Sequence, residues 1–312
     1  MPELPRIPVG KVIADVISWL TTHWSVFFDG ISAILLGFGN AVYYVLALPH
    51  PYLLTAVFAA LAFLVTRRAG LPIFTVIAFL LVDSMRLWND MLNTLAVVIV
   101  AAVIAIVIGV PVGIWAARSR SVSVIVRPLL DFMQTLPVFV YLLPAVFFFG
   151  IGVVPGIVAT IVFAVPPAVR LTELGIRQVD REVVEAAQAF GARPMQVLRE
   201  VQMPLAMPTV MAGVNQVIML ALSMVVVAGL VGAPGLGQVV VASTQSLNVA
   251  GGFEGGIAVV ILAVYLDRLT GGLAERGRRR GRSRRGQPGR VTPEEAEVAR
   301  DKQKSEQPAP VA

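Results

Sequence analysis

The chain of 312 residues is 57% hydrophobic and only 14% charged, with a mean hydropathy of +0.80. A soluble domain is about half apolar and about a quarter charged, so this composition excludes an ordinary soluble enzyme and predicts an all-α, polytopic membrane helix bundle. The absence of cysteine excludes a disulfide scaffold, a thiolate metal site and a cysteine nucleophile.

The positive charge of the chain is concentrated near its end. The net charge at pH 7 is +6, and Glu275–Arg290 alone contains eight arginines and one glutamate. A basic stretch directly after a membrane span is typical of a cytoplasmic anchor near anionic lipid, which we favour over a nucleic-acid partner. Residues 271–312 contain few large apolar side chains, so they are predicted to form a disordered basic and acidic tail.

Residues 1–30 are predicted to form an N-terminal segment with an interfacial helix. Three prolines within residues 1–8 favour irregular structure, and Lys11–Phe28 then has the pattern of an amphipathic helix. Its apolar face would lie in the membrane interface, and a helix that binds a soluble partner is the alternative. That face consists of Val12, Ile13, Val16, Ile17, Leu20 and Trp24.

Eight apolar segments follow, and they predict about seven to eight transmembrane helices. Residues 31–84 form an accessory N-terminal unit, and residues 85–270 form the main membrane unit. Two segments of the accessory unit are short, so they are either tilted spans or a re-entrant pair. The eight segments are residues 31–48, 51–66, 70–83, 92–117, 129–150, 154–170, 208–231 and 253–269.

The distribution of arginine between the spans predicts their orientation. Arginines follow the spans at 92–117, 154–170 and 253–269, whereas residues 151–154 and 232–252 contain neither Lys nor Arg. Because short cytoplasmic loops carry an excess of Lys and Arg, the arginine-rich segments and the C-terminal tail are predicted to face the cytoplasm. The chain is therefore predicted to be a multi-pass protein of the plasma (cytoplasmic) membrane.

The cytoplasmic loop at residues 171–207 has the pattern of two short helices joined by a glycine turn. Residues 180–190 are rich in helix formers, and Gly191 follows, where a helix C-terminus needs a left-handed residue. A second helix is predicted to run to about Gln202, with Pro204 ending it before the next span.

The same loop is predicted to expose a surface that is both apolar and charged. Its glutamates and arginines alternate with Phe190, Val197 and Leu198. Such a mixture, held by a sharp turn, is suited to docking another protein, and an ordinary interfacial hairpin is the alternative.

The residue spacing in this loop resembles the EAA loop of binding-protein-dependent ABC importer permeases. Glu-Ala-Ala is followed after three residues by Gly, and after nine more by Val-x-Met-Pro. The family pattern ends Ile-x-Leu-Pro, so Val201 and Met203 are conservative departures. The resemblance implies a type I importer permease fold, in which the loop couples to an ATPase. Carried over by position, the coupling residues are Glu185, Ala186, Ala187, Gly191 and Pro204.

Further runs within residues 85–270 resemble the glycine betaine/proline betaine branch of that family. They are Gly113–Ser119, Leu130–Pro137, Pro166–Thr172 and Ala212–Met224. The resemblance implies a membrane-spanning transport subunit, not an enzyme, that translocates glycine betaine, proline betaine or a related quaternary amine osmoprotectant. Import of methionine or another amino acid is the nearest alternative.

The same resemblance implies partners. They are an ATP-binding cassette ATPase subunit, an extracytoplasmic solute-binding protein and a second permease copy, in a homodimer or with a close paralogue, all within or against the lipid bilayer. The chain contains no Gly-x-x-x-x-Gly-Lys-Ser/Thr phosphate loop. ATP and Mg²⁺ are therefore expected in the ATPase subunit, and no cofactor is expected in this chain.

Polar residues within the spans predict the translocation path, because polar groups are costly in lipid and usually face the interior of a bundle. Hydrogen bonding between helices is the ordinary use of such residues and the alternative for each single position. The candidates are Asp131, Gln134, Thr135, Asn215, Gln216 and Ser223.

Two other classes of function have less support. A proton-coupled secondary carrier would use Asp131 and Glu254, but these carboxylates lie toward opposite ends of their spans. A membrane-embedded enzyme would need a catalytic constellation. His23 and His50 are the only histidines, and no His-x-x-x-His or Gly-x-Ser-x-Gly pattern occurs, so no catalytic or metal-binding residue is predicted.

Overall fold

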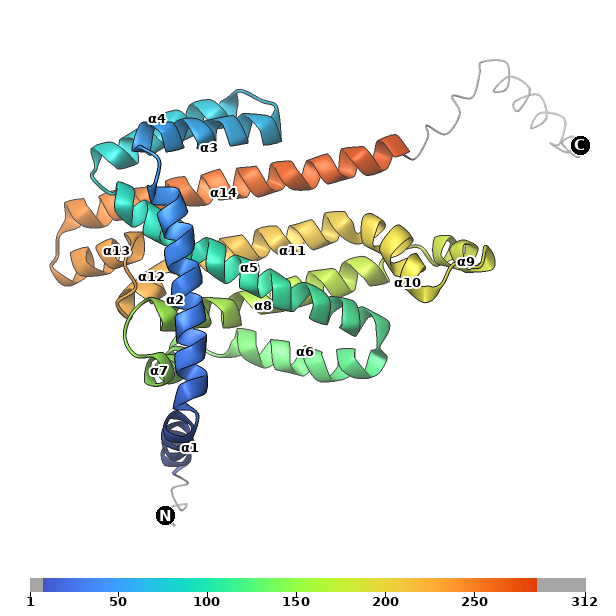
Figure 1. Ribbon diagram of the computed structural model, residues 1–312, viewed down its shortest axis with the longest axis horizontal. Coiled ribbons are helices and arrows are strands. Elements are labelled where there is room, and N and C mark those ends of the chain that lie inside the picture. Colours follow the sequence, from blue (N-terminus) through green and yellow to red (C-terminus); the bar gives the residue numbers. More distant parts are fainter. Residues whose placement is uncertain (1–7, 285–312) are drawn as a thin grey trace, which may run out of the picture.

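The computed structural model describes residues 8–284, and every regular element in that range is a helix. Four long helices, α5 (Trp88–Arg118), α8 (Val153–Arg177), α11 (Met203–Ser223) and α14 (Val249–Arg284), run side by side and form the body of the molecule (Figure 1). The others are α1 (Val9–His23), α2 (Ser25–Ala47), α3 (Pro51–Thr66), α4 (Gly70–Ser84), α6 (Arg120–Thr135), α7 (Val138–Phe149), α9 (Arg181–Ala189), α10 (Pro194–Gln196), η1 (Val197–Gln202), α12 (Val225–Leu230) and α13 (Leu236–Gln245).

The α5 and α8 helices pack against each other through small residues. A Cβ atom added to Gly113 of α5 would lie 2.6 Å from the Cβ of Thr172 and 2.7 Å from the carbonyl oxygen of Val169, both on α8. No side chain fits at such distances, so glycine is what permits the approach of the two backbones. Close contact through small residues is how helices associate in lipid, where burial of apolar surface gives no driving force.

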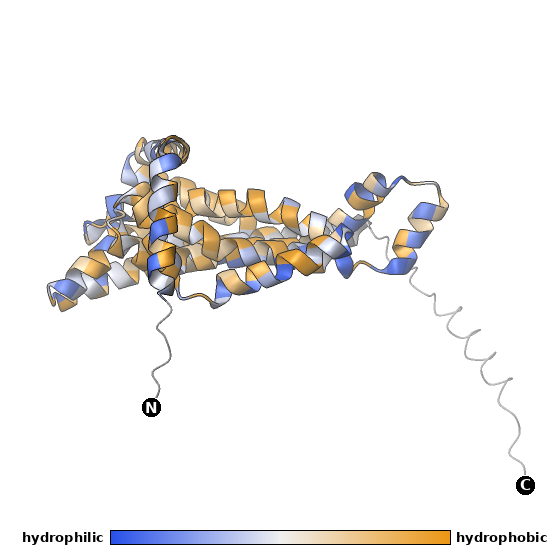
Figure 2. Cartoon of the chain, turned by 90° about the horizontal axis from the view of Figure 1, so that it is seen from below, coloured by the Kyte–Doolittle hydropathy of each residue, from blue (hydrophilic) through white to orange (hydrophobic). Residues whose placement is uncertain are grey.

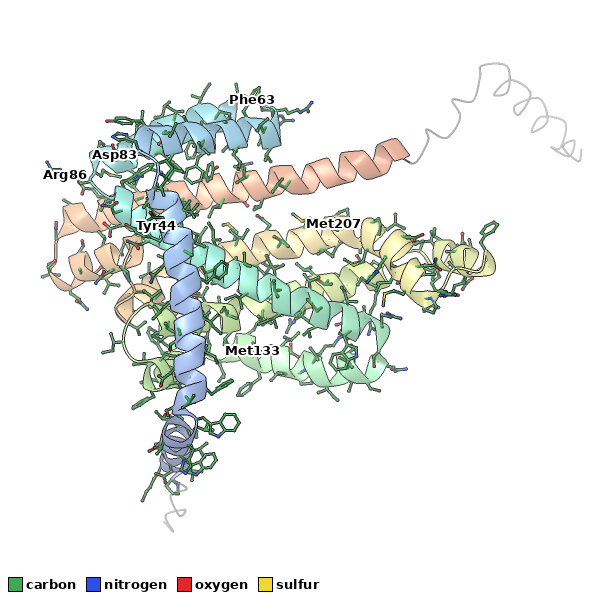
Figure 3. The ribbon with its side chains drawn as sticks, viewed as in Figure 1. Tyr44, Phe63, Asp83, Arg86, Met133 and Met207 are labelled. Atoms are coloured by element: carbon green, nitrogen blue, oxygen red, sulfur yellow. The ribbon has the colours of Figure 1, made fainter. Side chains whose placement is uncertain are left out.

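The outer surface of the bundle is apolar, as a lipid environment requires. Large hydrophobic side chains that project from it include Tyr44, Phe63 and Met207 (Figure 3). Hydrophobic residues dominate the length of the bundle, while hydrophilic residues are prominent at the end that carries α9 (Figure 2). In water an apolar surface of this extent would promote aggregation, so the structure supports the predicted membrane bundle.

The number of long apolar helices is smaller than predicted. Among the described residues, five helices are long and apolar enough to cross a membrane, or six if a bent helix pair counts as one span, against the predicted seven to eight. The predicted short spans at residues 51–66 and 70–83 form α3 and α4, of 16 and 15 residues. Both are shorter than the roughly 20 residues that cross a bilayer upright.

The predicted span at residues 129–150 is not one helix. It is divided between α6 and α7, which are bent by 94° relative to each other. Leu136 and Pro137 between them are extended, with ψ angles of 133° and 137°. Proline disfavours helical geometry in the residue before it and has no N–H to donate, so the chain turns here despite its unbroken hydrophobicity.

The N-terminal helices also differ from the prediction. The amphipathic helix predicted over Lys11–Phe28 ends at His23, and α2 begins at Ser25, well before the span predicted at 31–48. The α2 helix packs on α5 but runs across the direction that the long helices share (Figure 1). The α2 helix is long and apolar enough to span a membrane, but it is not aligned with the other long helices.

The last helix is longer than predicted. A disordered tail is predicted from residue 271, whereas α14 continues to Arg284. The glycines at this point, Gly271 and Gly272, are accommodated within the helix. The rest of the predicted tail, including the end of the Glu275–Arg290 basic stretch, lies outside the described residues.

Candidate functional site

The glycine turn predicted in the loop at residues 171–207 is present. The α9 helix is capped at its N-terminus by Asp180, whose Oδ1 accepts a hydrogen bond of 3.1 Å from the Glu182 N–H. Two residues after its last residue, Ala189, Gly191 has a φ of +82°, a left-handed conformation that favours glycine. The N–H of the next residue, Ala192, then donates to the carbonyl of Ala187 at 3.1 Å and closes the turn. The prediction of a left-handed helix end at Gly191 is confirmed.

The second half of the loop differs from the prediction. Pro204 does not end the second helix, because η1, a π-helical turn, leads directly into α11, and Pro204 lies in the first turn of α11. Proline is accepted there because a first-turn N–H has no partner within its own helix. Pro204 therefore lies at the start of a span that begins at Met203, not at the predicted 208.

The loop has an exposed part and a buried part. Phe190, at the tip of α9, is 93% exposed, and Glu185 and Ala186 are exposed beside it. Val197 and Leu198 are buried, which corrects their predicted exposure. Leu198 packs with apolar residues at the ends of α8 and α11, namely Ile176, Ala206 and Val210. This contact fixes the loop to the two spans that it connects.

The three polar candidates on α6 lie close together near its C-terminal end. The carboxylate of Asp131 is paired with the guanidinium of Arg170 on α8. The Asp131 side chain is 64% exposed and that of Arg170 is 40% exposed. Thr135 is exposed and Gln134 is partly buried one turn further along. The α6 helix thus presents a continuous polar face ahead of its break at Leu136.

The candidates on α11 have two different surroundings. Asn215 faces α14, where its amide nitrogen donates to Asp267 at 3.1 Å and its amide oxygen accepts from Thr270. It therefore links two helices, which was the alternative for each single position. Gln216 and Ser223 are exposed on α11, and the hydroxyl of Ser223 donates to the carbonyl of Met219 at 3.0 Å.

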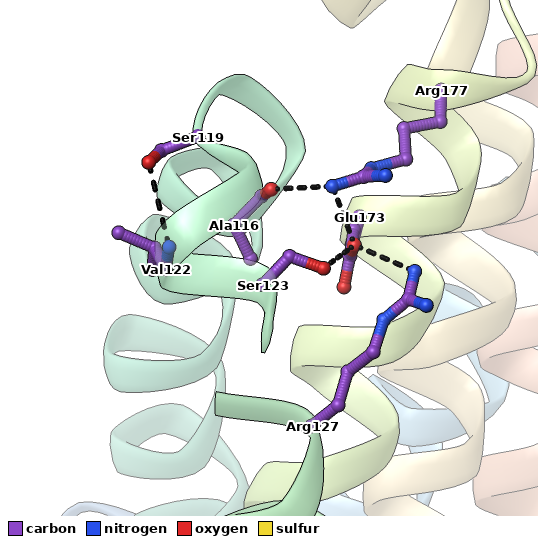
Figure 4. Close-up of polar contacts among 7 residues, drawn as sticks. All are labelled: Ala116, Ser119, Val122, Ser123, Arg127, Glu173 and Arg177. Carbon is purple, nitrogen blue, oxygen red and sulfur yellow. Dashed lines mark hydrogen bonds and ion pairs between the residues drawn. The ribbon is translucent and has the colours of Figure 1, made fainter. Parts of the chain in front are cut away.

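A buried carboxylate joins α5, α6 and α8 next to the loop (Figure 4). Glu173 of α8 has a side chain that is only 4% exposed, and its Oε1 atom accepts two hydrogen bonds and forms a further ion pair. Ser123 and Arg127 of α6 donate at 2.8 and 2.9 Å, and the guanidinium of Arg177 on α8 is paired with Oε1 at 3.0 Å. Arg177 also donates to the carbonyl of Ala116, in the last turn of α5, at 2.9 Å. We call Ser123, Arg127, Glu173 and Arg177 the Glu173 cluster.

The sequence prediction missed the Glu173 cluster because it ended the span at residue 170 and assigned Glu173 to the loop. A signal for the cluster was present in the spacing of the charged residues. Arg170, Glu173 and Arg177 follow one another at three and four residues, which places them on one face if the helix continues. The α8 helix does continue to Arg177.

Comparisons with known proteins agree with this arrangement. Residues 109–279 match the family described as binding-protein-dependent transport system inner membrane component. A chain of the MetNI methionine ABC transporter, solved in inward-facing conformations, has a similar fold, with a TM-score of 0.54 at 25% identity. That likeness covers 59% of this chain and 92% of the other.

Relatives in sequence match almost the whole chain. The glycine betaine transport system permease protein OpuAB of Bacillus subtilis (strain 168) is 50% identical over 281 residues, 90% of this chain and 99% of the relative. The glycine betaine/proline betaine transport system permease protein ProW of Escherichia coli (strain K12) is 45% identical over 282 residues, 89% of this chain and 78% of the relative.

Proposed function

This chain belongs to the family of binding-protein-dependent transport system inner membrane components, and we propose that its solute is glycine betaine or a related quaternary amine osmoprotectant such as proline betaine. The chain is a transport subunit of a membrane importer, not an enzyme. The observation that carries the solute assignment is the 50% identity to a glycine betaine permease over 99% of that relative's length. Sequence identity over the full length of a relative supports a shared solute better than a match confined to the central membrane helices.

We propose that an ATPase subunit docks on α9 from the cytoplasm. The arginines around the loop favour a cytoplasmic position, because short cytoplasmic loops of membrane proteins carry an excess of Lys and Arg. Glu185, Ala186 and Phe190 supply an exposed surface with both a charge and a large aromatic ring. The chain lacks a phosphate loop, so ATP and Mg²⁺ belong to the ATPase subunit in this proposal.

Movement of the docked ATPase would reach the spans through the loop. Leu198 of η1 packs with Ile176 of α8 and with Ala206 and Val210 of α11. A displacement of α9 therefore acts on the ends of two spans at once. A packed element of this kind changes conformation as a unit, which is the requirement for alternating access driven by ATP.

The polar face of α6 and α8 supports a second permease copy. Asp131 and Arg170 are both substantially exposed in this chain, although they belong to helices of the bundle. An exposed ion pair within a membrane helix is unfavourable against lipid and favourable against a partner or a water-filled path. We propose that this face, with Gln134, Thr135, Gln216 and Ser223, lines the path between two copies.

Reconstitution tests the proposal directly. The chain is placed in liposomes with and without its ATPase and its extracytoplasmic solute-binding protein, and ATP-dependent uptake of labelled glycine betaine is followed. Uptake by the complete set alone is the expected result. Uptake of methionine in preference to glycine betaine would support an amino-acid permease, which the fold shared with the methionine transporter also permits. Gradient-driven uptake by the chain alone would contradict the proposal.

A further inference from the structure

The end of α8 and the coupling loop form one packed body. Arg177 is the last residue of α8, and only residues 178–180 separate it from α9. Those residues stay hydrogen bonded to α8, since the N–H of Gln178 donates to the carbonyl of Leu174 at 2.9 Å. Val179 and Leu198 pack in the same apolar cluster as Ile176. A movement of α9 therefore moves Glu173 and Arg177 with it.

The α6 helix contributes no residue to the apolar cluster of that body. The apolar cluster around Leu198 includes residues of α5, α8, η1 and α11, but none of α6. The one buried apolar residue of α6, Leu130, packs further along the bundle against Ala168 and Val165 of α8. At the loop end, α6 is joined to α5 through Ser119, and it is linked to α8 by Ser123 and Arg127, which donate to Glu173.

The polar contacts between α6 and α8 form a continuous row. Ser123, Arg127 and Asp131 follow one another at intervals of four residues on α6, so they share a face of that helix. On α8 their partners are Glu173 and Arg170. The row begins beside the coupling loop and ends one turn before Gln134 and Thr135, at the break between α6 and α7.

Glu173 is buried, whereas its two arginine partners reach the surface of the chain. A carboxylate buried in a low-dielectric interior is stable only while its donors remain in place. Arg127 and Arg177 are 57% and 39% exposed, so either could reach water without Glu173. Glu173 cannot, and any separation of α6 from α8 would remove two of its three partners and leave only Arg177 of its own helix. The cluster therefore resists separation of the two helices.

We propose that Glu173 is a positioning residue that makes α6 move together with the coupling loop. This inference rests on the proposed function, in which an ATPase displaces α9. Through Glu173 that displacement passes to α6, and the polar face of α6 before the break is carried with it. The coupling loop thus controls three helices, namely α8 and α11 through Leu198 and α6 through the Glu173 cluster.

The first test is Glu173→Gln in the complete reconstituted transporter. ATP hydrolysis and solute uptake are measured together, and the result is expressed as solute transported per ATP hydrolysed. We expect this ratio to fall on the order of tenfold, within the range typical of coupling between distant sites, while ATP hydrolysis continues. The matched control is Glu254→Gln, an exposed glutamate of α14 outside the row, for which an unchanged ratio is expected.

The second test replaces the polar contact by a covalent one. The chain contains no cysteine, so Ser123→Cys with Glu173→Cys provides two unique thiols. A short bifunctional methanethiosulfonate reagent bridges α6 and α8, while a monofunctional reagent of the same family modifies the thiols without bridging. We expect the bridged protein to recover the ratio of uptake to hydrolysis and the monofunctionally modified protein to remain uncoupled.

The two tests separate the inference from the proposed function. Absence of uptake by the wild-type complete set would contradict the proposed function itself. A wild-type ratio in Glu173→Gln, when the wild-type set transports, would overturn the inference alone. A bridge that stops transport would also overturn it, because the two helices would then have to separate during the cycle.

Discussion

In this permease the α8 helix is held differently against α5 and against α6. Against α5 it packs through glycine and other small residues, so that the two backbones approach closely. Against α6 it is held by the hydrogen bonds and ion pairs of Glu173 and Arg170. Contact between backbones cannot adjust without loss of packing, whereas side-chain hydrogen bonds can be kept while helices change their tilt. The α5–α8 contact is therefore suited to a fixed frame, and the α6–α8 contact to transmitting movement.

The largest effect on stability is expected from Gly113→Ala at the α5–α8 contact. The added methyl group would overlap Thr172 and the carbonyl of Val169, and the backbone oxygen cannot rotate away. Overpacking of this kind costs about 3 kcal/mol of unfolding free energy. The loss is measured as a lower unfolding temperature of the detergent-solubilised protein.

Gly37→Ala in α2 is the matched control for this substitution. A methyl group at Gly37 meets no atom within 4 Å, and alanine favours a helix over glycine by about 1 kcal/mol. Equal stability of the two variants would mean that the α5–α8 contact is looser than the structure has it.

A smaller effect is expected at the α6–α8 contact, when the buried carboxylate of Glu173 is changed to an amide. Glu173→Gln removes the charge that Arg127 and Arg177 share, at a cost of about 2 kcal/mol. Asp131→Asn removes the carboxylate of an exposed pair and is expected to cost less than about 1 kcal/mol. If the two variants unfold at the same temperature, burial does not distinguish the two pairs.

How much of this contrast the sequence predicts depends on the range of the interaction. The turn at Gly191 is local, and its glycine, its spacing and the preceding helix formers sufficed to predict it. The partner of Asn215 is Asp267, 52 residues away, and no pattern in the sequence connects them. The sequence shows a proline at the break, Pro137, but residues 129–150 are hydrophobic on both sides of it and therefore favoured the prediction of one continuous span.

An effect on stability between those of Glu173→Gln and Asp131→Asn is expected from Gly191→Val, together with a large effect on transport. A β-branched residue at a φ of +82° costs about 1 to 2 kcal/mol, and open space around the position adds no clash. The protein should still insert into the membrane, but the altered turn should misplace α9 and reduce solute uptake. Gly191→Asn is the matched control, because asparagine tolerates left-handed geometry. Normal uptake by Gly191→Val would show that the turn is not needed for coupling.

The smallest effect on stability, below about 0.5 kcal/mol, is expected from Glu185→Lys, because an exposed substitution removes no buried contact. Its effect on assembly should be large if the ATPase contacts the negative charge of Glu185 on α9. We therefore expect less ATPase to copurify with Glu185→Lys than with Glu254→Lys, which makes the same charge change at an exposed site of α14. Equal copurification would remove Glu185 from the interface and leave Phe190, which is 93% exposed at the tip of α9, as the contact to substitute next.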